Sequence, residues 1–197
     1  MTTDVPLKLA VIIGSVREGR VGPVFAEWIT AHAATSFEVD VIDLADHADL
    51  PLAFPAKDAA PSAEIVAAVS RLTPRLEAAD AFVVVTPEYN HSYPAALKNL
   101  VDWHFTQWQA KPVGFVSYGG VSGGLRAVEH LRGVFAEMHA VTVRDQVSFA
   151  DYWTLFGEDG GLTPSDAAEA GAKALLGQLD WWARALSEAR ASRPYAA

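Results

Sequence analysis

The chain has 197 residues, of which 51% are hydrophobic and 20% are charged, a composition that predicts one globular domain over residues 1–197. Its 15 basic and 24 acidic residues give a net charge of −9, so we expect no nucleic-acid partner. Cysteine is absent, which excludes disulfides and thiolate nucleophiles, and no leader-like or bilayer-length apolar run is found, so we expect a cytoplasmic protein without a membrane partner.

Strand-like and helix-like segments alternate along the sequence. The strand-like runs cover residues 7–13, 37–44, 81–86, 113–118 and 140–143. The helix-like segments cover approximately residues 22–34, 62–79, 94–103, 123–138 and 165–193. Several strands are apolar at consecutive positions, which is typical of a parallel sheet covered on both faces. The alternation therefore predicts an α/β fold with a doubly wound parallel sheet and right-handed crossovers.

Two irregular segments, residues 45–61 and 148–164, are rich in Pro, Gly or Asp, and we expect them to lie over a site. In doubly wound sheets, ligands bind beyond the carboxyl ends of the strands, where the strand order reverses. The loops that follow the first, third and fourth strands are residues 14–22, 87–93 and 119–124. All three contain unusual residues, so the candidate site is expected at these loops.

The first of these loops, Gly-Ser-Val-Arg-Glu-Gly-Arg at residues 14–20, has the composition of an anion site. It opens a helix, whose N-terminal N–H groups attract a phosphate. Ser15 offers a hydroxyl donor, and Arg17 and Arg20 offer charge-assisted hydrogen bonds. Gly22 allows the backbone to come close to the anion. A surface turn with two solvated arginines is the alternative interpretation of this loop alone.

The other two loops fit a planar ligand. In the second, Pro87 stiffens the exit from the strand, and backbone amides and the Tyr89 ring are available to a planar heterocycle. The third has four glycines in the six positions 119–124, which favours close approach of the backbone to a ligand. An ordinary turn and tight helix–strand packing are the respective alternatives.

Taken together, the three loops resemble those of the NAD(P)H-dependent FMN reductase family. The resemblance is carried by Gly-Ser-x-Arg after strand one, by Pro-Glu-Tyr-Asn after strand three with Leu-Lys-Asn and Asp-Trp on the next helix, and by Ser-Tyr-Gly-Gly after strand four. It covers about residues 7–145. It implies a flavodoxin-like three-layer sandwich with a five-stranded parallel sheet in the order 2-1-3-4-5.

The resemblance also implies the site. The residues that resemble the FMN phosphate site are Ser15, Arg17, Arg20, Val21 and Gly22. Those that resemble the segment along the flavin ring are Pro87, Glu88, Tyr89 and Asn90, and those of the opposite wall are Ser117, Tyr118, Gly119 and Gly120. Many relatives have small hydroxyl or amide side chains at the positions of Arg20 and Gly22, so the phosphate contacts differ there.

The implied activity is an FMN-dependent NAD(P)H oxidoreductase. Hydride passes from the nicotinamide to the flavin, and electrons then pass to free flavin, a quinone, an azo dye or another small-molecule acceptor. Because the cofactor supplies the chemistry, no catalytic side chain is assigned. No metal site is expected, since the six histidines lack ligand spacing. The family also implies a homodimer or homotetramer.

Three other functions are weighed against this one. A flavodoxin-type electron carrier binds FMN without using nicotinamide, but such carriers resemble a Thr-Gly-Asn-Thr phosphate loop, which is absent here. A non-enzymatic binding module of the same fold is the second. The third is a serine hydrolase, because residues 120–124 fit G-x-S-x-G. That hydrolase needs an acid and then a histidine later in the chain, and no histidine follows Asp145.

The aromatic segment at residues 103–108 admits two interpretations. Trp103, Phe105 and Trp108 follow the helix after the second loop. Large aromatic side chains often anchor interfaces, so we expect this segment either to meet a second copy of the chain or to pack in the core.

Overall fold

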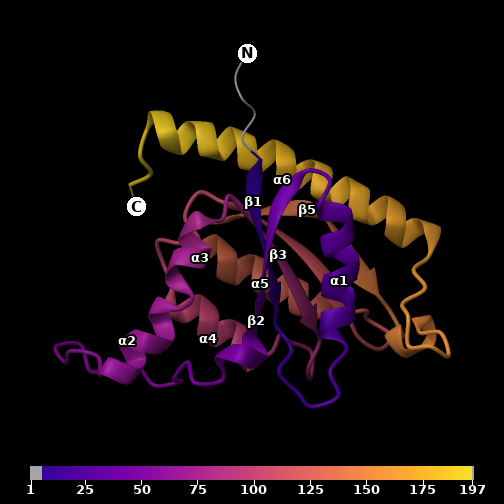
Figure 1. The fold of residues 1–197 in the computed structure, drawn as a ribbon, viewed down its shortest axis with the longest axis horizontal. Helices are drawn as coiled ribbons and strands as arrows, with labels where there is room; N and C mark the ends of the chain where they lie inside the picture. Colours follow the sequence, from indigo (N-terminus) through magenta and orange to yellow (C-terminus); the bar gives the residue numbers. More distant parts are fainter. Residues whose placement is uncertain (1–5, 197) are drawn as a thin grey trace.

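The computed structural model describes residues 6–196 and contains a sheet of five parallel strands (Figure 1). The strands are β1 (Leu7–Ile13), β2 (Phe37–Asp43), β3 (Ala81–Pro87), β4 (Pro112–Tyr118) and β5 (Val141–Phe149). Their order is β2-β1-β3-β4-β5, and each neighbouring pair is parallel. The flavodoxin-like order implied by the sequence is confirmed.

Helices cover both faces of the sheet. They are α1 (Gly22–Ala33), α2 (Ala63–Ser70), α3 (Thr73–Ala78), α4 (Ala95–Trp103), α5 (Leu125–Glu137) and α6 (Asp166–Ser192), with short 3-10 helices η1 (Leu44–His47) and η2 (Tyr152–Leu155). One core cluster joins the sheet to α1 and α6, and the other joins it to α2, α3, α4 and α5. Figure 1 shows the long α6 running along the molecule. Every residue of β3 and β4 is buried, as their consecutive apolar residues predict.

Two predicted boundaries are wrong. The helix expected over residues 62–79 is two helices, because Pro74 in the first turn of α3 has no N–H to continue the preceding helix. The last strand runs to Phe149 instead of ending at residue 143. Polar residues at 144–146 interrupt its apolar pattern, but Val147 and Phe149 return to the core.

The aromatic segment at residues 103–108 divides between core and surface. Trp108 is fully buried and packs against Phe82 and Phe135, with ring centroids 4.7 and 5.4 Å away. Of the two interpretations, the core one is therefore right for Trp108 and the interface one is wrong, because its indole fills the space between β3 and α5. Phe105 is 48% exposed, and Trp103 is half-buried against Phe54.

Trp108→Ala should lower the free energy of unfolding by about 3–5 kcal/mol, because it leaves a cavity among fully buried side chains. Phe105→Ala is the matched control from the same segment and should cost less than about 1 kcal/mol, since much of its ring is already in water. Chemical denaturation of both variants measures the difference. Equal losses would contradict the assignment of Trp108 to the core.

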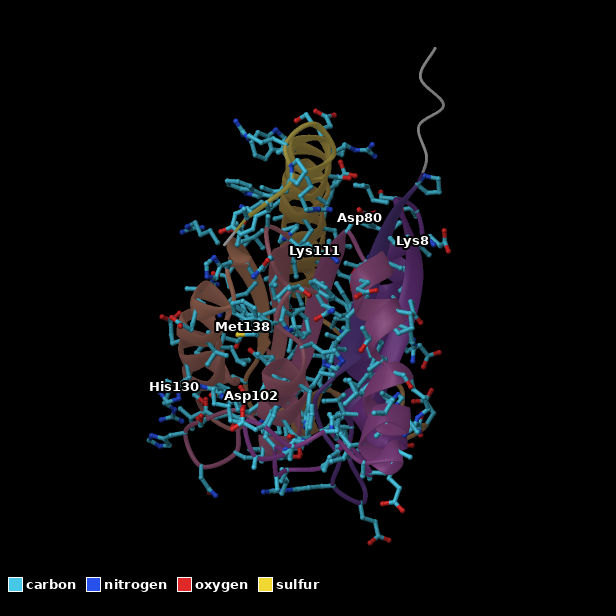
Figure 2. All side chains as sticks on the ribbon, turned by 90° about the vertical axis from the view of Figure 1, so that its left-hand side faces the viewer. Lys8, Asp80, Asp102, Lys111, His130 and Met138 are labelled. Atoms are coloured by element: carbon cyan, nitrogen blue, oxygen red, sulfur yellow. The ribbon has the colours of Figure 1, made fainter. Side chains whose placement is uncertain are left out.

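Lys111 is buried at the amino-terminal end of the sheet. Its Nζ donates hydrogen bonds of 2.9 Å to the carbonyl oxygens of Leu76 and Glu77 at the end of α3. Burial and then the charge of Arg190 lower the pKa of Lys111 from 10.5 to about 8. Figure 2 shows Lys111, Asp80 and Lys8 toward one end of the molecule, away from His130 and Asp102.

This lowered pKa predicts a stability change in alkali. Between pH 8 and 10.5 the unfolded chain keeps a proton on Lys111 that the folded protein releases, so the free energy of unfolding rises with pH, by up to about 3 kcal/mol. Denaturation experiments between pH 8 and 10.5 should show the free energy of unfolding rising in the parent but not in Lys111→Met. Lys57→Met, at an exposed position, is the control and should retain the rise. A parallel rise in Lys111→Met would contradict the assignment.

Candidate flavin site

The carboxyl ends of β1, β3 and β4 bring the three predicted loops together. In the parallel register Ile13 lies opposite Val85, and Pro87 lies opposite Tyr118. Two backbone hydrogen bonds continue this alignment past the strands: Gly14 N–H to the Val85 carbonyl (2.9 Å) and Glu88 N–H to the Tyr118 carbonyl (3.1 Å). The loops therefore start from fixed, adjacent points.

Arg20 holds the first loop against the end of β2. Its two terminal nitrogens donate to the two carboxylate oxygens of Asp43 at 2.7 and 2.6 Å, and one of them also donates to the Ser15 carbonyl at 3.2 Å. Asp43 in turn accepts the backbone N–H of Ala45. A two-pronged pair of this kind fixes orientation as well as charge. The guanidinium of Arg20 is thus engaged within the protein, and its contact with a phosphate stays a prediction.

Arg17 connects the first loop to the second. Its guanidinium carbon lies 3.5 Å from the centroid of the Tyr89 ring, a cation–π contact. The side chain is exposed, and no carboxylate among residues 6–196 pairs with it. Its N–H groups therefore remain available to an anion beside the loop.

The interior of the first loop offers donors without partners. The Ser15 hydroxyl is buried and, apart from the adjacent Tyr118 hydroxyl, has no hydrogen-bond partner in the described chain. The backbone N–H groups of residues 16–19 also donate to no protein atom there. N–H and O–H donors without protein partners, in a loop that opens a helix, fit a phosphate.

Gly22 is required for this arrangement. A Cβ at Gly22 would lie 2.3 Å from Ser15 Oγ and 3.0 Å from the Tyr118 hydroxyl oxygen, so any side chain would displace one of these groups. Burial raises the pKa of Tyr118 well above its usual range, which keeps its hydroxyl protonated as a donor.

The second loop is a tight turn. Tyr89 and Ser92 exchange backbone hydrogen bonds of 2.8 and 3.1 Å, and the two residues between them, Asn90 and His91, have φ values of 50° and 69°. Positive φ at both central positions is the geometry of a type I′ turn. The turn presents Asn90 at its tip, while Pro87 is buried in β3.

Glu88 fastens this turn to α5. Its side chain is 6% exposed, and its carboxylate accepts hydrogen bonds from Arg126 Nε (2.6 Å) and from the Arg126 backbone N–H (3.2 Å). Burial alone would raise the pKa of Glu88, but hydrogen bonds from Ser122 and Arg126 and the Arg126 charge outweigh it, so the pKa lies below its usual value. Glu88 is therefore ionised at neutral pH and joins the second loop to the third.

The third loop is packed from within. The hydroxyls of Ser117 and Ser148 both donate to the Gly123 carbonyl at 2.8 Å. Gly124 has a φ of 87°, and a Cβ there would lie 2.7 Å from that of Ser117. These contacts support the stretch at residues 117–120. The Ser122 hydroxyl donates a hydrogen bond to the Glu88 carboxylate. This contact gives no support to Ser122 as a nucleophile.

The segment at residues 148–164 lies against the third loop and adds candidate residues that the sequence motifs do not reveal. The backbone N–H groups of Asp151 and Tyr152 donate to the carbonyls of Gly120 (3.1 Å) and Gly119 (3.3 Å). The Tyr152 ring packs against Tyr118, with centroids 5.3 Å apart. The sequence signal for these residues is the adjacent aromatic pair Tyr152 and Trp153 in a segment otherwise rich in Asp and Gly. The other segment, residues 45–61, bonds to α4 through Asn99 and Trp103, and it also lines a pocket with Val16 of the first loop.

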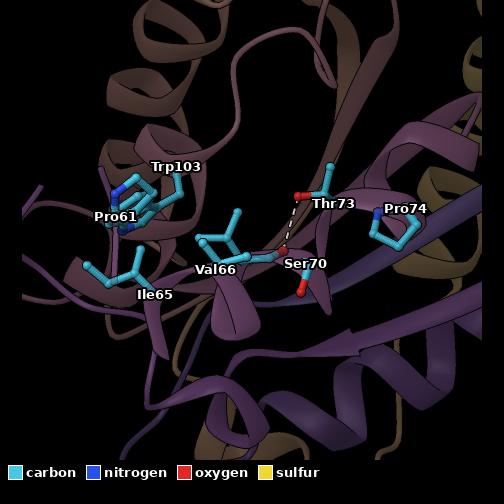
Figure 3. Close-up of a pocket in the computed structure, with 8 residues that line it drawn as sticks. Pro61, Ile65, Val66, Ser70, Thr73, Pro74 and Trp103 are labelled. Carbon is cyan, nitrogen blue, oxygen red and sulfur yellow. Dashed lines mark hydrogen bonds between the residues drawn. The ribbon is translucent and has the colours of Figure 1, made fainter. Parts of the chain in front are cut away.

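An apolar pocket of about 380 Å³ lies elsewhere, between α2, α3 and Trp103 (Figure 3). Its lining contains no charged side chain. The hydroxyls of Ser70 and Thr73 are bonded to carbonyl oxygens of α2. This pocket therefore lacks the donors that a phosphate needs, and the loops at the carboxyl edge remain the candidate cofactor site.

The fold and the donor-rich loop beside two adjoining walls define a flavodoxin-like protein that binds a phosphate-bearing cofactor. The model of the NADPH-dependent FMN reductase family matches residues 7–154. The chain belongs to this family, and it is an oxidoreductase that uses NAD(P)H and FMN.

Individual relatives agree. An NAD(P)H-dependent FMN reductase of Schizosaccharomyces pombe is 36% identical over 154 residues, which cover 71% of this chain and 76% of the relative. A quinone reductase of Escherichia coli is 34% identical over 142 residues, covering 70% and 73%. The structure also resembles the flavoenzyme NAD(P)H:acceptor oxidoreductase FerB of Paracoccus denitrificans, with a TM-score of 0.66, 26% identity and coverage of 92% and 98%.

Two further properties concern residues 6–196. No helix in this range is both long and apolar enough to cross a membrane. Over the same range, no three His, Asp or Glu side chains gather in a group that could hold a metal ion.

Removing the anchor of Glu88 should weaken flavin binding. Arg126→Ala leaves the ionised carboxylate without its charged partner and loosens the turn at residues 88–93, so we expect the Kd values of FMN and riboflavin to rise by about tenfold each. Arg126→Lys should recover part of the loss. Quenching of flavin fluorescence measures both constants.

Lys98→Ala is the control for this experiment, because it removes the exposed Lys98–Asp102 ion pair from the neighbouring helix α4. It should leave both Kd values near those of the parent. Unchanged flavin binding in Arg126→Ala would contradict a supporting role for the Glu88–Arg126 pair.

Proposed function

We propose that the loop at residues 15–22 binds the FMN phosphate and that the flavin ring lies between residues 87–90 and 117–120. The observation that carries this proposal is the set of donors inside the first loop. The amides of residues 16–19 have no partner in the described chain, and the buried Ser15 hydroxyl has none except the adjacent Tyr118 hydroxyl. Arg17 supplies the positive charge at its rim. The whole described chain then acts as one FMN-binding domain.

When bound, FMN accepts hydride from a reduced nicotinamide and delivers two electrons to an acceptor. The residues of this chain hold and orient the reactants. The Arg20–Asp43 pair fixes the phosphate loop, and the Glu88–Arg126 pair fixes the turn at residues 88–93. Such fixed placement is what brings two planar rings into reacting contact.

A quinone is the acceptor class that we propose. Relatives named quinone reductases support it, including that of Escherichia coli and a 2-hydroxy-1,4-benzoquinone reductase of a Burkholderia species, 33% identical over 141 residues. Oxidation of NAD(P)H by the FMN-loaded protein with 1,4-naphthoquinone tests this assignment. A protein that binds FMN but oxidises no nicotinamide would instead be an electron carrier.

The same proposal includes a homodimer or homotetramer in the cytoplasm. Leu52 and Phe54, in the segment that follows η1, and Val66 on α2 are exposed, and apolar surface of this kind favours association. Light scattering at micromolar concentration measures the assembly state, and a monomer would overturn this part of the proposal.

The Arg17→Ala variant should distinguish contacts with the FMN phosphate from contacts with the flavin ring. The variant loses the charge beside the loop and also the contact with Tyr89, so riboflavin reports the ring effect alone, whereas FMN reports both. We expect FMN affinity to fall by about 1.5–3 kcal/mol more than riboflavin affinity. Arg144→Ala, at a side chain that is 90% exposed on β5, is the control and should change neither. Equal losses for the two ligands would place the phosphate elsewhere.

A further inference from the structure

Trp153 is an exposed tryptophan beside the third loop. It belongs to η2, and 59% of its surface is accessible. A Cβ placed on Gly120 would lie 3.7 Å from the Cη2 atom of its indole, so the ring stands directly against the glycine backbone of the proposed flavin wall. An indole left in water at this place has a flat face available for a ligand.

The turn that carries Trp153 is held firmly. Asp151 adopts a left-handed conformation with φ of 44°, and its carbonyl accepts both the backbone N–H and the hydroxyl of Thr154 at 2.9 Å. The bonds from Asp151 and Tyr152 to Gly120 and Gly119 fix the turn to the third loop. The indole is therefore presented from a defined position.

Tyr152 and Trp153 form a continuous aromatic edge, which we call the aromatic shelf. Their ring centroids lie 5.5 Å apart, and the Tyr152 ring continues into the packed aromatic side chains of Tyr118 and Phe25. The two rings meet edge to face, with an interplanar angle of 69°, so the exposed indole of Trp153 is the member on which a planar ring can stack.

The charge around the aromatic shelf narrows the choice of ligand. Between Arg144 and Lys173 the sequence contains no Lys, Arg or His, whereas Asp151, Glu158 and Asp159 are acidic. The segment that carries the aromatic shelf therefore supplies no cation of its own to a diphosphate or an anionic acceptor, and the nearby arginines, Arg17 and Arg20, belong to the first loop. A neutral planar ring needs no such cation.

We propose that the aromatic shelf of Tyr152 and Trp153 is the subsite that binds a neutral quinone beside the flavin ring. This inference rests on the proposed placement of the flavin between residues 87–90 and 117–120. It assigns Trp153 to the selection of the acceptor and not to the binding of FMN or nicotinamide.

Equilibrium binding of 1,4-naphthoquinone to the oxidised, FMN-loaded protein tests the inference without turnover. Calorimetric titration of Trp153→Ala should give a Kd about tenfold above that of the parent, and Trp153→Phe should stay within about threefold of it. Trp181→Ala is the matched control, because Trp181 is 63% exposed on α6, and its Kd should equal that of the parent. In turnover, the KM for naphthoquinone should rise in Trp153→Ala while kcat with ferricyanide, a small anion without a planar ring, is unchanged.

The outcomes distinguish the subsite from the cofactor site. Naphthoquinone binding to Trp153→Ala as tight as to the parent would overturn the inference. A Trp153→Ala variant that binds FMN or NADH more weakly, with the quinone Kd unchanged, would assign the indole to that ligand instead. Failure of the parent to bind FMN, as measured by quenching of flavin fluorescence, would overturn the proposed function itself.

Discussion

The buried parallel register of β1, β3 and β4 is the constraint on which the site depends. These strands are apolar on both faces, so helices must cover them and their carboxyl ends must meet at one edge. The hydrogen bond from Gly14 to Val85 extends the register into the first loop. Loops that are far apart in the sequence thus begin on three consecutive strands at one edge of the sheet, before any side chain contributes.

Charged pairs then fix the loops relative to one another. Arg20–Asp43 ties the first loop to β2, Arg17 stacks on Tyr89 of the second loop, and Glu88–Arg126 ties the second loop to the helix after the third. Several of these groups are partly or largely buried, where charge-assisted hydrogen bonds are strong and an unpaired partner is costly. The result is a candidate site whose three loops are fixed to one another by the protein alone, while the amides of residues 16–19 keep no partner in the described chain.

Local pattern predicted most of the sheet but only part of the site. The consecutive apolar residues of β3 and β4 revealed buried strands, and the loop motifs pointed to the family and its strand order. The partner of Arg20 is 23 residues away and that of Glu88 is 38 residues away, so neither pair follows from periodicity or local spacing. The burial of Trp108 depends on Phe82 and Phe135 from two other elements, which is why a surface role seemed equally consistent with the sequence.

Backbone NMR of the labelled protein during titration with FMN, and separately with riboflavin, tests the central claim most directly. The amide signals of residues 15–22 should shift strongly with FMN and only slightly with riboflavin, because only FMN carries the phosphate. Those of residues 88–90 and 119–120 should shift with both ligands. Shifts centred instead on the apolar pocket lined by Ile65, Val66 and Trp103, with the first loop unmoved, would contradict the account.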